Sequence, residues 1–192
     1  FPEHVDIEIT NVCNMHCPMC YRRSEKFGAI RQGLMDFGLF RKTIDECAIS
    51  GVYSVRLSIR GEPLLHTQLL DFIRYAKGRD IREVSFLTNA MLLDEKMSAG
   101  LIDAGLDWMT VSFDGLDKTY EKIRHPAKYE EALGRLKAFR RIRDMKGRKK
   151  PAVKILGISF APPTTRVRRL PPFVKGGSGG ILIFVLKFAS FL

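Results

Sequence analysis

Short apolar runs alternate along this chain with longer stretches in which apolar residues recur every three to four positions. The short runs are rich in β-branched and aromatic residues, and the first alternates strictly between polar and apolar side chains, which is typical of strands. Five runs are therefore predicted to be strands: residues 5–10, 52–59, 83–88, 108–113 and 152–160.

The stretches between these strands have helical spacing. In the first of them, Phe37, Phe40, Ile44 and Cys47 fall on one helix face, and Asp94 is placed to cap a later helix. The predicted helices cover residues 35–50, 67–77, 94–104, 117–123 and 129–146. Strands that alternate with helices indicate an α/β fold with a parallel sheet, either a barrel-like arrangement or an open doubly wound sheet.

The pattern breaks after residue 160. The remainder contains two Pro-Pro pairs, a GGSGG run and a final stretch, ILIFVLKFASFL, that is apolar except for one lysine and one serine. Twelve such residues are too few to cross a bilayer as a helix, so we expect no membrane span. We divide the chain into a core domain, residues 1–160, and an irregular tail, residues 161–192. The tail is either a last strand preceded by a loop or a stretch unrelated to the parent fold.

Composition agrees with a globular domain and leaves its basic charge to be explained. Of 192 residues, 45% are hydrophobic and 28% are charged, and the net charge is +11. Residues 139–150 contain seven basic residues and one aspartate. Such a run can attract nucleic acid, but no recognised nucleic-acid motif accompanies it. We interpret it as a solvated helix end and loop, and we expect no nucleic-acid partner.

Three of the four cysteines, Cys13, Cys17 and Cys20, lie within eight residues, and Cys47 stands apart. A disulfide framework spreads its cysteines along the chain and forms in oxidising compartments. No charged segment followed by an apolar run opens the chain, so we expect no secretory signal. These features predict a cytoplasmic protein with a metal site.

The cysteine spacing, C-x₃-C-x₂-C, favours a [4Fe–4S] cluster. Three thiolates can bind three irons of a cubane and leave the fourth open, whereas four cysteines close an electron-transfer cluster. A structural zinc site would need a fourth ligand, and the nearby candidate is His16, whose position next to Cys17 makes tetrahedral ligation awkward. A reactive thiol would need only one or two cysteines.

Further polar motifs follow the other predicted strands. RGEP (60–63) follows the second strand, TN (88–89) the third, and SFDG (112–115) the fourth. The carboxyl ends of parallel strands lie at one edge of a sheet, where α/β proteins bind their ligands. The sequence therefore predicts one active site that includes the cysteines.

In these motifs and their order, the chain resembles the radical S-adenosylmethionine (SAM) superfamily from about Val5 to Ile158. It is most similar to members that carry an extra C-terminal cluster-binding (SPASM-type) domain and modify peptides, proteins or carbohydrates. The resemblance implies a partial (β/α)₆ barrel with a [4Fe–4S] cluster and SAM as cofactors. It also implies an enzyme that cleaves SAM reductively and abstracts a substrate hydrogen through the 5′-deoxyadenosyl radical.

The resemblance implies site residues one at a time. Cys13, Cys17 and Cys20 match the cluster ligands, and Met19 matches a position near the adenine of SAM. The motif after the second strand binds the SAM amino group in the family. Here Gly61 and Glu62 match it, although Arg60 replaces its first glycine.

The third and fourth strands and the segment after them carry the remaining matches. Asn89 matches a residue suited to the ribose hydroxyls, with Ala90 in place of a glycine. Ser112 and Asp114 match an S-x-D-G motif, and Arg124 matches an arginine that pairs with the SAM carboxylate.

The resemblance also implies partners: a reductant protein of the flavodoxin or ferredoxin type and a substrate that is a peptide, a sugar or a small molecule. No cysteine follows Cys47, so either the protein lacks auxiliary clusters or the sequence stops before them. The alternative function is a non-catalytic iron–sulfur or zinc-binding module. Such a module would not need the SAM-contacting motifs after three further strands, so we favour the enzyme.

Overall fold

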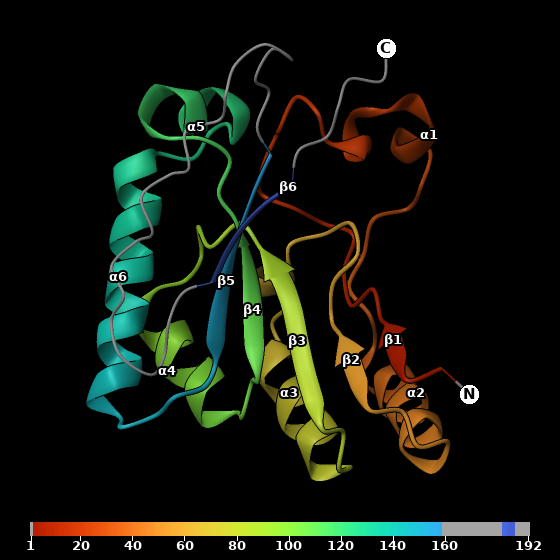
Figure 1. The fold of residues 1–192 in the computed structure, drawn as a ribbon. Helices are drawn as coiled ribbons and strands as arrows, with labels where there is room; N and C mark the ends of the chain where they lie inside the picture. The colour runs from red at the N-terminus through yellow and green to blue at the C-terminus, as the bar shows by residue number, and fades with distance from the viewer. Residues whose placement is uncertain (1, 159–181, 187–192) are drawn as a thin grey trace.

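Six parallel strands form one sheet in the computed structural model, which describes residues 2–158 and 182–186 (Figure 1). The strands are β1 (His4–Asp6), β2 (Ser54–Arg56), β3 (Glu83–Thr88), β4 (Trp108–Ser112), β5 (Ala152–Ile158) and β6 (Leu182–Leu186). Each strand pairs with the next along the chain, and β1 and β6 are the edges. The sheet is therefore open, and the predicted α/β fold of a partial (β/α) barrel is confirmed.

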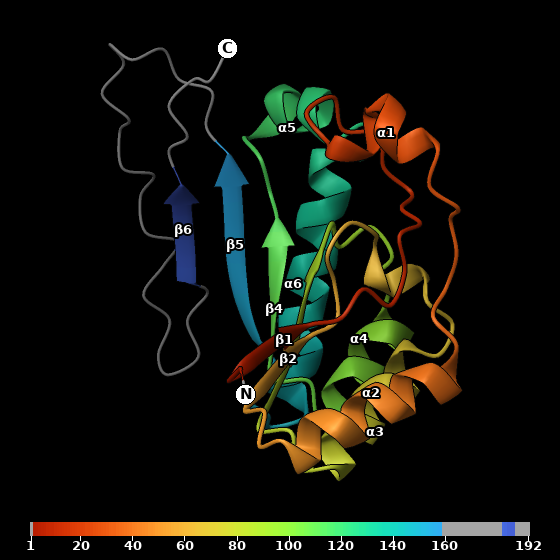
Figure 2. The ribbon, with the colours of Figure 1, turned by 90° about the vertical axis from the view of Figure 1, so that its right-hand side faces the viewer.

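The longer helices form a layer on one face of this sheet (Figure 2). They are α2 (Phe37–Ile49), α3 (Leu69–Gly78), α4 (Glu95–Asp103) and α6 (Tyr129–Met145). Shorter elements are the 3₁₀ helices η1 (Tyr21–Arg23) and η2 (Pro63–Leu65), with α1 (Glu25–Gly28) and α5 (Asp117–Ile123). Figure 1 shows α1 and α5 beyond the carboxyl ends of the strands. In the described part of the chain, no helix is long and apolar enough to span a membrane.

The core lies between the sheet and the helix layer. Val55, Val84 and Phe86 on the strands are fully buried, and so are Phe40 of α2 and Phe72 of α3. The rings of Phe40 and Phe72 stack with their centroids 4.0 Å apart. Burial of apolar surface on this face of the sheet holds the strands in place. The polar motifs lie at the carboxyl ends of the strands.

The predicted elements occur in the predicted order, and their bounds agree to different degrees. Strand β3 has the predicted bounds, and the Asp94 side chain caps α4 by accepting a hydrogen bond from the Met97 amide at 2.6 Å. The first two strands are shorter than predicted, with three residues each. β6 lies within the tail, and residues 159–181 and 187–192 lie outside the described residues.

Candidate active site

The cysteines lie on the loop that leaves β1 and passes over the carboxyl ends of the strands (Figure 1). The Cys20 amide donates to the Cys17 carbonyl at 3.0 Å, which closes a tight turn between these two residues. Cys13, Cys17 and Cys20 gather in one side-chain cluster with Met15 and Tyr120. The structure therefore brings the three predicted cluster ligands together, in a partly buried setting.

A single zinc ion and an iron–sulfur cluster place different demands on the three thiols. In the region covered by the structure, no three His, Cys, Asp or Glu side chains converge on one metal-ion position. Ligands of a single zinc must all lie about 2.0–2.3 Å from it, whereas cubane thiolates each bind a different iron. His16, the candidate fourth zinc ligand, is exposed.

Burial raises the pKa of both the Cys13 and the Cys17 thiol above its usual value. At Cys17 the positive charge of Arg124 opposes this effect. Because iron binds the thiolate, cluster assembly has to release these protons, and Arg124 assists that release at Cys17.

The buried hydroxyl of Tyr120 indicates that a polar group can bind beside the cysteines. Its side chain is fully buried, and its hydroxyl has no hydrogen-bond partner within the described residues. Burial raises the pKa of Tyr120 to about 12, so the group is a neutral hydroxyl. A buried unsatisfied polar group costs about 1–3 kcal/mol. An orphaned hydroxyl in the same cluster as three thiols fits a polar cofactor that supplies its partner.

Gly61 lies against the start of the cysteine loop. A Cβ atom at this position would be 2.1 Å from the Thr10 carbonyl oxygen and 2.8 Å from that of Val12. The next amide, that of Glu62, donates to the Val12 carbonyl at 2.8 Å. Only glycine permits this approach, and it ties the segment after β2 to the segment before Cys13.

Arg60, which replaces a family glycine, turns away from this contact. Its amide and its Nε both donate to Glu8 Oε1, at 3.0 Å and 2.8 Å, and its Nη2 pairs with the other carboxylate oxygen. The substitution therefore adds an ion pair at the side of the loop and leaves Gly61 in place.

Glu62 is 2% exposed and accepts three hydrogen bonds. The donors are the Thr88 hydroxyl at 2.6 Å, the Asn89 amide at 2.7 Å and the Leu64 amide at 3.2 Å. Burial raises the pKa of Glu62 to about 7, and the hydrogen bonds and the charge of Arg124 limit the rise. A buried carboxylate of this kind favours a cationic partner such as an ammonium group.

Asn89 follows β3 and reaches the cysteine loop. Its Nδ2 lies 2.8 Å from Asn14 Oδ1 and 3.9 Å from Cys13 Sγ, and its Oδ1 accepts a hydrogen bond from the Met91 amide at 2.9 Å. The next residue, Ala90, has a φ of +62°, in the left-handed region that favours glycine. The backbone therefore keeps the conformation that a glycine at this position would adopt most easily.

Asp114 and Arg124 form an ion pair beside Cys17. Asp114 is 0% exposed, and its Oδ2 accepts from Arg124 Nε at 2.5 Å and also pairs with Nη2. Arg124 Nη1 lies 3.8 Å from Cys17 Sγ. Of the other predicted site residues, Ser112 is buried at the end of β4 and Met19 is exposed on the cysteine loop.

Three residues of this site were missed by sequence reasoning: Asn14, Thr88 and Tyr120. Asn14 lies between two cysteines, so its position was a usable signal. Thr88 ends β3 inside a motif of which only Asn89 was given a role. Tyr120 carried no signal, because a tyrosine on an apolar helix face is usually part of the core.

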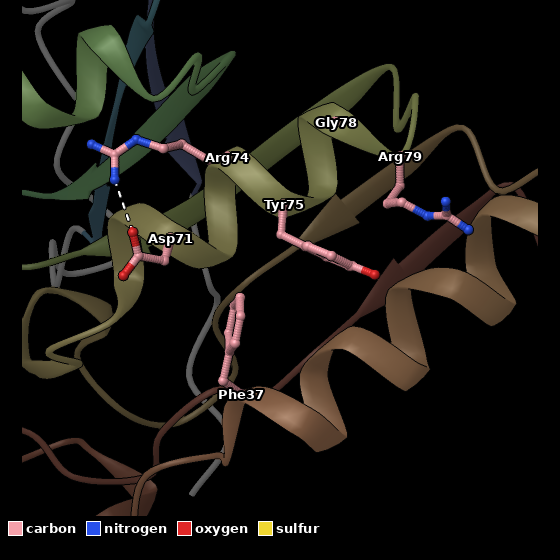
Figure 3. Close-up of a pocket in the computed structure, with 6 residues that line it drawn as sticks. All are labelled: Phe37, Asp71, Arg74, Tyr75, Gly78 and Arg79. Atoms are coloured by element: carbon pink, nitrogen blue, oxygen red, sulfur yellow. Dashed lines mark hydrogen bonds and ion pairs between the residues drawn. The ribbon is translucent and has the colours of Figure 1, made fainter.

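A separate surface groove lies between α2 and α3 (Figure 3). Its lining residues are Phe37, Asp71, Arg74, Tyr75, Gly78 and Arg79. Figure 3 shows the rings of Phe37 and Tyr75 between the two helices and the Asp71–Arg74 ion pair at one side. None of the predicted site residues lines this groove.

Several relatives with similar sequences are named GTP 3′,8-cyclases. The probable GTP 3′,8-cyclase of Methanococcus maripaludis is 39% identical over 120 residues, which are 61% of this chain and 38% of the relative. The GTP 3′,8-cyclase of Chlorobaculum tepidum is 33% identical over 141 residues, 71% of this chain and 41% of the relative. The chain thus spans about 40% of the length of these relatives.

Solved structures share the fold at lower identity. Streptococcus suis SuiB bound to S-adenosylmethionine has a TM-score of 0.66 and 18% identity, covering 82% of this chain and 34% of SuiB. AnSMEcpe with bound AdoMet has a TM-score of 0.64 and 18% identity, covering 81% of this chain and 43% of that protein. The family model of the radical SAM superfamily matches residues 7–148. The chain therefore belongs to the radical SAM superfamily, whose cofactors are a [4Fe–4S] cluster and S-adenosylmethionine.

Proposed function

We propose that this protein is a radical SAM enzyme that cleaves SAM reductively and abstracts a hydrogen atom from an organic substrate. The observation that carries the proposal is the meeting of Glu62, Asn89 and Arg124 with the cysteine loop at one edge of the sheet. When bound, the cluster supplies one electron that breaks the C5′–S bond of SAM, leaving methionine and the 5′-deoxyadenosyl radical that takes the substrate hydrogen.

The residues of this chain hold and orient the cofactors. The thiolates of Cys13, Cys17 and Cys20 bind three irons of the cluster. The Glu62 carboxylate accepts hydrogen bonds from the SAM ammonium group, and Gly61 lets the backbone approach it closely.

Four further residues complete the proposed SAM site. The Arg124 guanidinium, held by Asp114, pairs with the SAM carboxylate. Asn89 faces the ribose hydroxyls, and Met19 lies near the adenine. Ser112 adds a hydroxyl at the end of β4.

Aromatic residues next to the cysteine loop exclude water. The rings of Phe113, Tyr120 and Tyr129 pack together, with the Phe113 and Tyr120 centroids 4.6 Å apart. A dry environment strengthens the electrostatic contacts of the site and protects a radical from side reactions.

The partners of the reaction are an electron donor of the flavodoxin or ferredoxin type and a peptide, sugar or small-molecule substrate. Residues 1–160 act as the SAM-cleaving core. Similar proteins support this range of substrates, because several relatives are named GTP 3′,8-cyclases, while SuiB has been solved with a precursor peptide and BtrN with 2-DOIA.

Anaerobic reconstitution with iron and sulfide, followed by assay for 5′-deoxyadenosine with a strong reductant, tests the proposal. Serine at Cys13, Cys17 or Cys20 abolishes both the cluster absorbance and the product, while Cys47→Ser, the matched control in α2, retains both. A cluster that forms without SAM cleavage would establish a non-catalytic iron–sulfur module. One equivalent of zinc after anaerobic purification would establish a zinc module instead.

A further inference from the structure

Two of the three cluster cysteines receive N–H groups from side chains on distant segments. Asn89 Nδ2 lies 3.9 Å from Cys13 Sγ, and Arg124 Nη1 lies 3.8 Å from Cys17 Sγ. Both distances suit a hydrogen bond to sulfur, whose radius exceeds that of oxygen. Asn89 follows strand β3 and Arg124 follows helix α5, so the two contacts come from separate elements of the fold.

Both donors are held in place by further bonds. Asn89 Nδ2 is also 2.8 Å from Asn14 Oδ1, and its own Oδ1 accepts the Met91 amide. The Arg124 guanidinium is fixed by Asp114, whose carboxylate is fully buried. A buried carboxylate paired through two nitrogens of one guanidinium limits the orientations that the guanidinium can take.

The contact to Cys17 leaves Arg124 able to bind a second partner. A guanidinium has five N–H groups in a planar fork. Nε and Nη2 each donate one to Asp114, and Nη1 donates one to Cys17. Two N–H groups remain for the carboxylate of SAM, so the contact to the thiolate adds to the proposed cofactor role of Arg124.

Hydrogen bonds to the sulfurs are among the factors that set the reduction potential of an iron–sulfur cluster. Reduction adds negative charge, part of which resides on the thiolates. An N–H dipole or a positive charge at a sulfur stabilises the reduced state more than the oxidised state, and so raises the potential.

We propose that Asn89 and Arg124 donate hydrogen bonds to the cluster thiolates of Cys13 and Cys17 and raise the reduction potential of the cluster. Asp114 is the positioning residue that directs Arg124 at Cys17. The inference rests on the proposed function, since it requires the cluster at these cysteines. It assigns to Asn89 and Arg124 an electronic role in addition to SAM binding.

The test is an EPR-monitored redox titration of the reconstituted full chain without SAM, which separates potential from cofactor binding. Asn89→Asp replaces the N–H donor by a carboxylate oxygen of the same shape, and Asn14 can rotate its amide to donate to it. The double variant D114N/R124Q removes the ion pair without changing net charge, and the shorter glutamine no longer reaches Cys17. Asp114→Glu keeps the charge and displaces the carboxylate that directs Arg124.

The surface ion pair Asp71–Arg74 on α3 supplies the matched control, with its nitrogen and oxygen 2.9 Å apart (Figure 3). D71N/R74Q carries the same two substitutions and the same zero change in net charge. We expect midpoint potentials more negative than wild type in N89D, D114N/R124Q and D114E, and an unchanged potential in D71N/R74Q. Circular dichroism and iron content identify any variant that fails to fold or to load.

An unchanged potential in both N89D and D114N/R124Q at normal iron content would overturn the inference, as would an equal shift in the surface control. If those variants lose SAM affinity while the SAM-free potential stays fixed, Asn89 and Arg124 act on SAM alone. Failure of the proposed function looks different, because the wild-type chain would then assemble no cluster at these cysteines or produce no 5′-deoxyadenosine.

Discussion

Glu62 is a buried acid, and its protonation makes the free energy of unfolding depend on pH. Its folded pKa, about 7, lies above the ordinary value of 4.5 because the side chain is buried. Between these two pH values the folded state binds more protons than the unfolded state, so the free energy of unfolding decreases as pH rises. The full effect is about 3 kcal/mol, and it is complete once pH passes about 7.

We expect Glu62→Gln to remove this pH dependence, because glutamine does not titrate. Urea unfolding of the apo protein at several pH values from 4.5 to 8 measures the slope. One donor around Glu62 loses its acceptor in the variant, which lowers stability at acid pH. At pH 8 the variant avoids the cost of a buried charge, so the curve becomes flatter. Glu25→Gln, on exposed α1, is the control and retains the wild-type slope. A wild-type slope in E62Q would assign the pH dependence to another group.

At Gly61 the geometry of the cysteine loop leaves no room for a side chain. Gly61→Ala places a Cβ against two carbonyl oxygens of the loop, with the nearer only 2.1 Å away. We expect a loss of about 1–3 kcal/mol in stability, as for other overpacked sites, together with reduced iron uptake. Chemical denaturation and iron analysis after reconstitution measure the two effects.

Gly134→Ala in α6 is the opposite case and serves as the control. Among the described residues, no atom beyond its chain neighbours and the helix backbone lies within 4 Å of the Cβ position there. The helix therefore gains about 0.5–1 kcal/mol from the more restricted unfolded chain, and iron uptake stays at the wild-type level. Equal effects of the two substitutions would show that the loop tolerates a side chain at residue 61.

At the scale of elements, the helices and the middle strands follow from periodicity, while the lengths of the first two strands do not. β3 has the predicted bounds; it pairs with β2 and β4 inside the sheet, and four of its six residues are buried. β1 and β2 are three residues long, although each run reads as a longer strand. The chain leaves the sheet early to form the loop that carries the cysteines, and that departure depends on contacts with other strands rather than on local propensity.

The motifs at the strand ends were predictable, because strand order and residue type identify them. The directions of their side chains were not. Arg60 turns to Glu8, Asn89 reaches Cys13, and Tyr120 packs under the cysteine loop. Each depends on a partner far away in the sequence, which periodicity cannot identify.

Asp94 is the N-terminal cap of α4, as its place in the sequence predicts. Its carboxylate accepts the Met97 amide at the start of α4. Asp94→Ala removes this cap and is expected to lower the free energy of unfolding by about 1 kcal/mol. Lys96→Ala, exposed in the same turn, should stay within about 0.5 kcal/mol of wild type. Denaturant midpoints of the two variants decide the matter, and equal losses would contradict the capping assignment.

At the scale of the whole molecule, acidic partners neutralise most of the basic run from 139 to 150. Arg141 pairs with Glu95 at 2.8 Å and Lys146 pairs with Asp103 at 2.9 Å, both on α4. Lys150 pairs with Asp107 at 2.6 Å. Three of the seven basic residues therefore pair with α4 or with the residue before β4, and most of the run is exposed, as expected of a solvated helix end.

Arg148 and Lys149 form no ion pair among the described residues, so they are the part of the run left to attract polyanions. We expect only weak, sequence-independent association with duplex DNA, because the contact involves few phosphates and no groove-reading element. Fluorescence anisotropy should show binding at about 0.05 M salt that is lost by about 0.2 M. R148E/K149E weakens the low-salt binding, whereas the same reversal at the paired Arg141 has a smaller effect. Binding that persists at the higher salt with a preferred sequence would contradict this assignment, because that behaviour requires an element that reads bases in a groove.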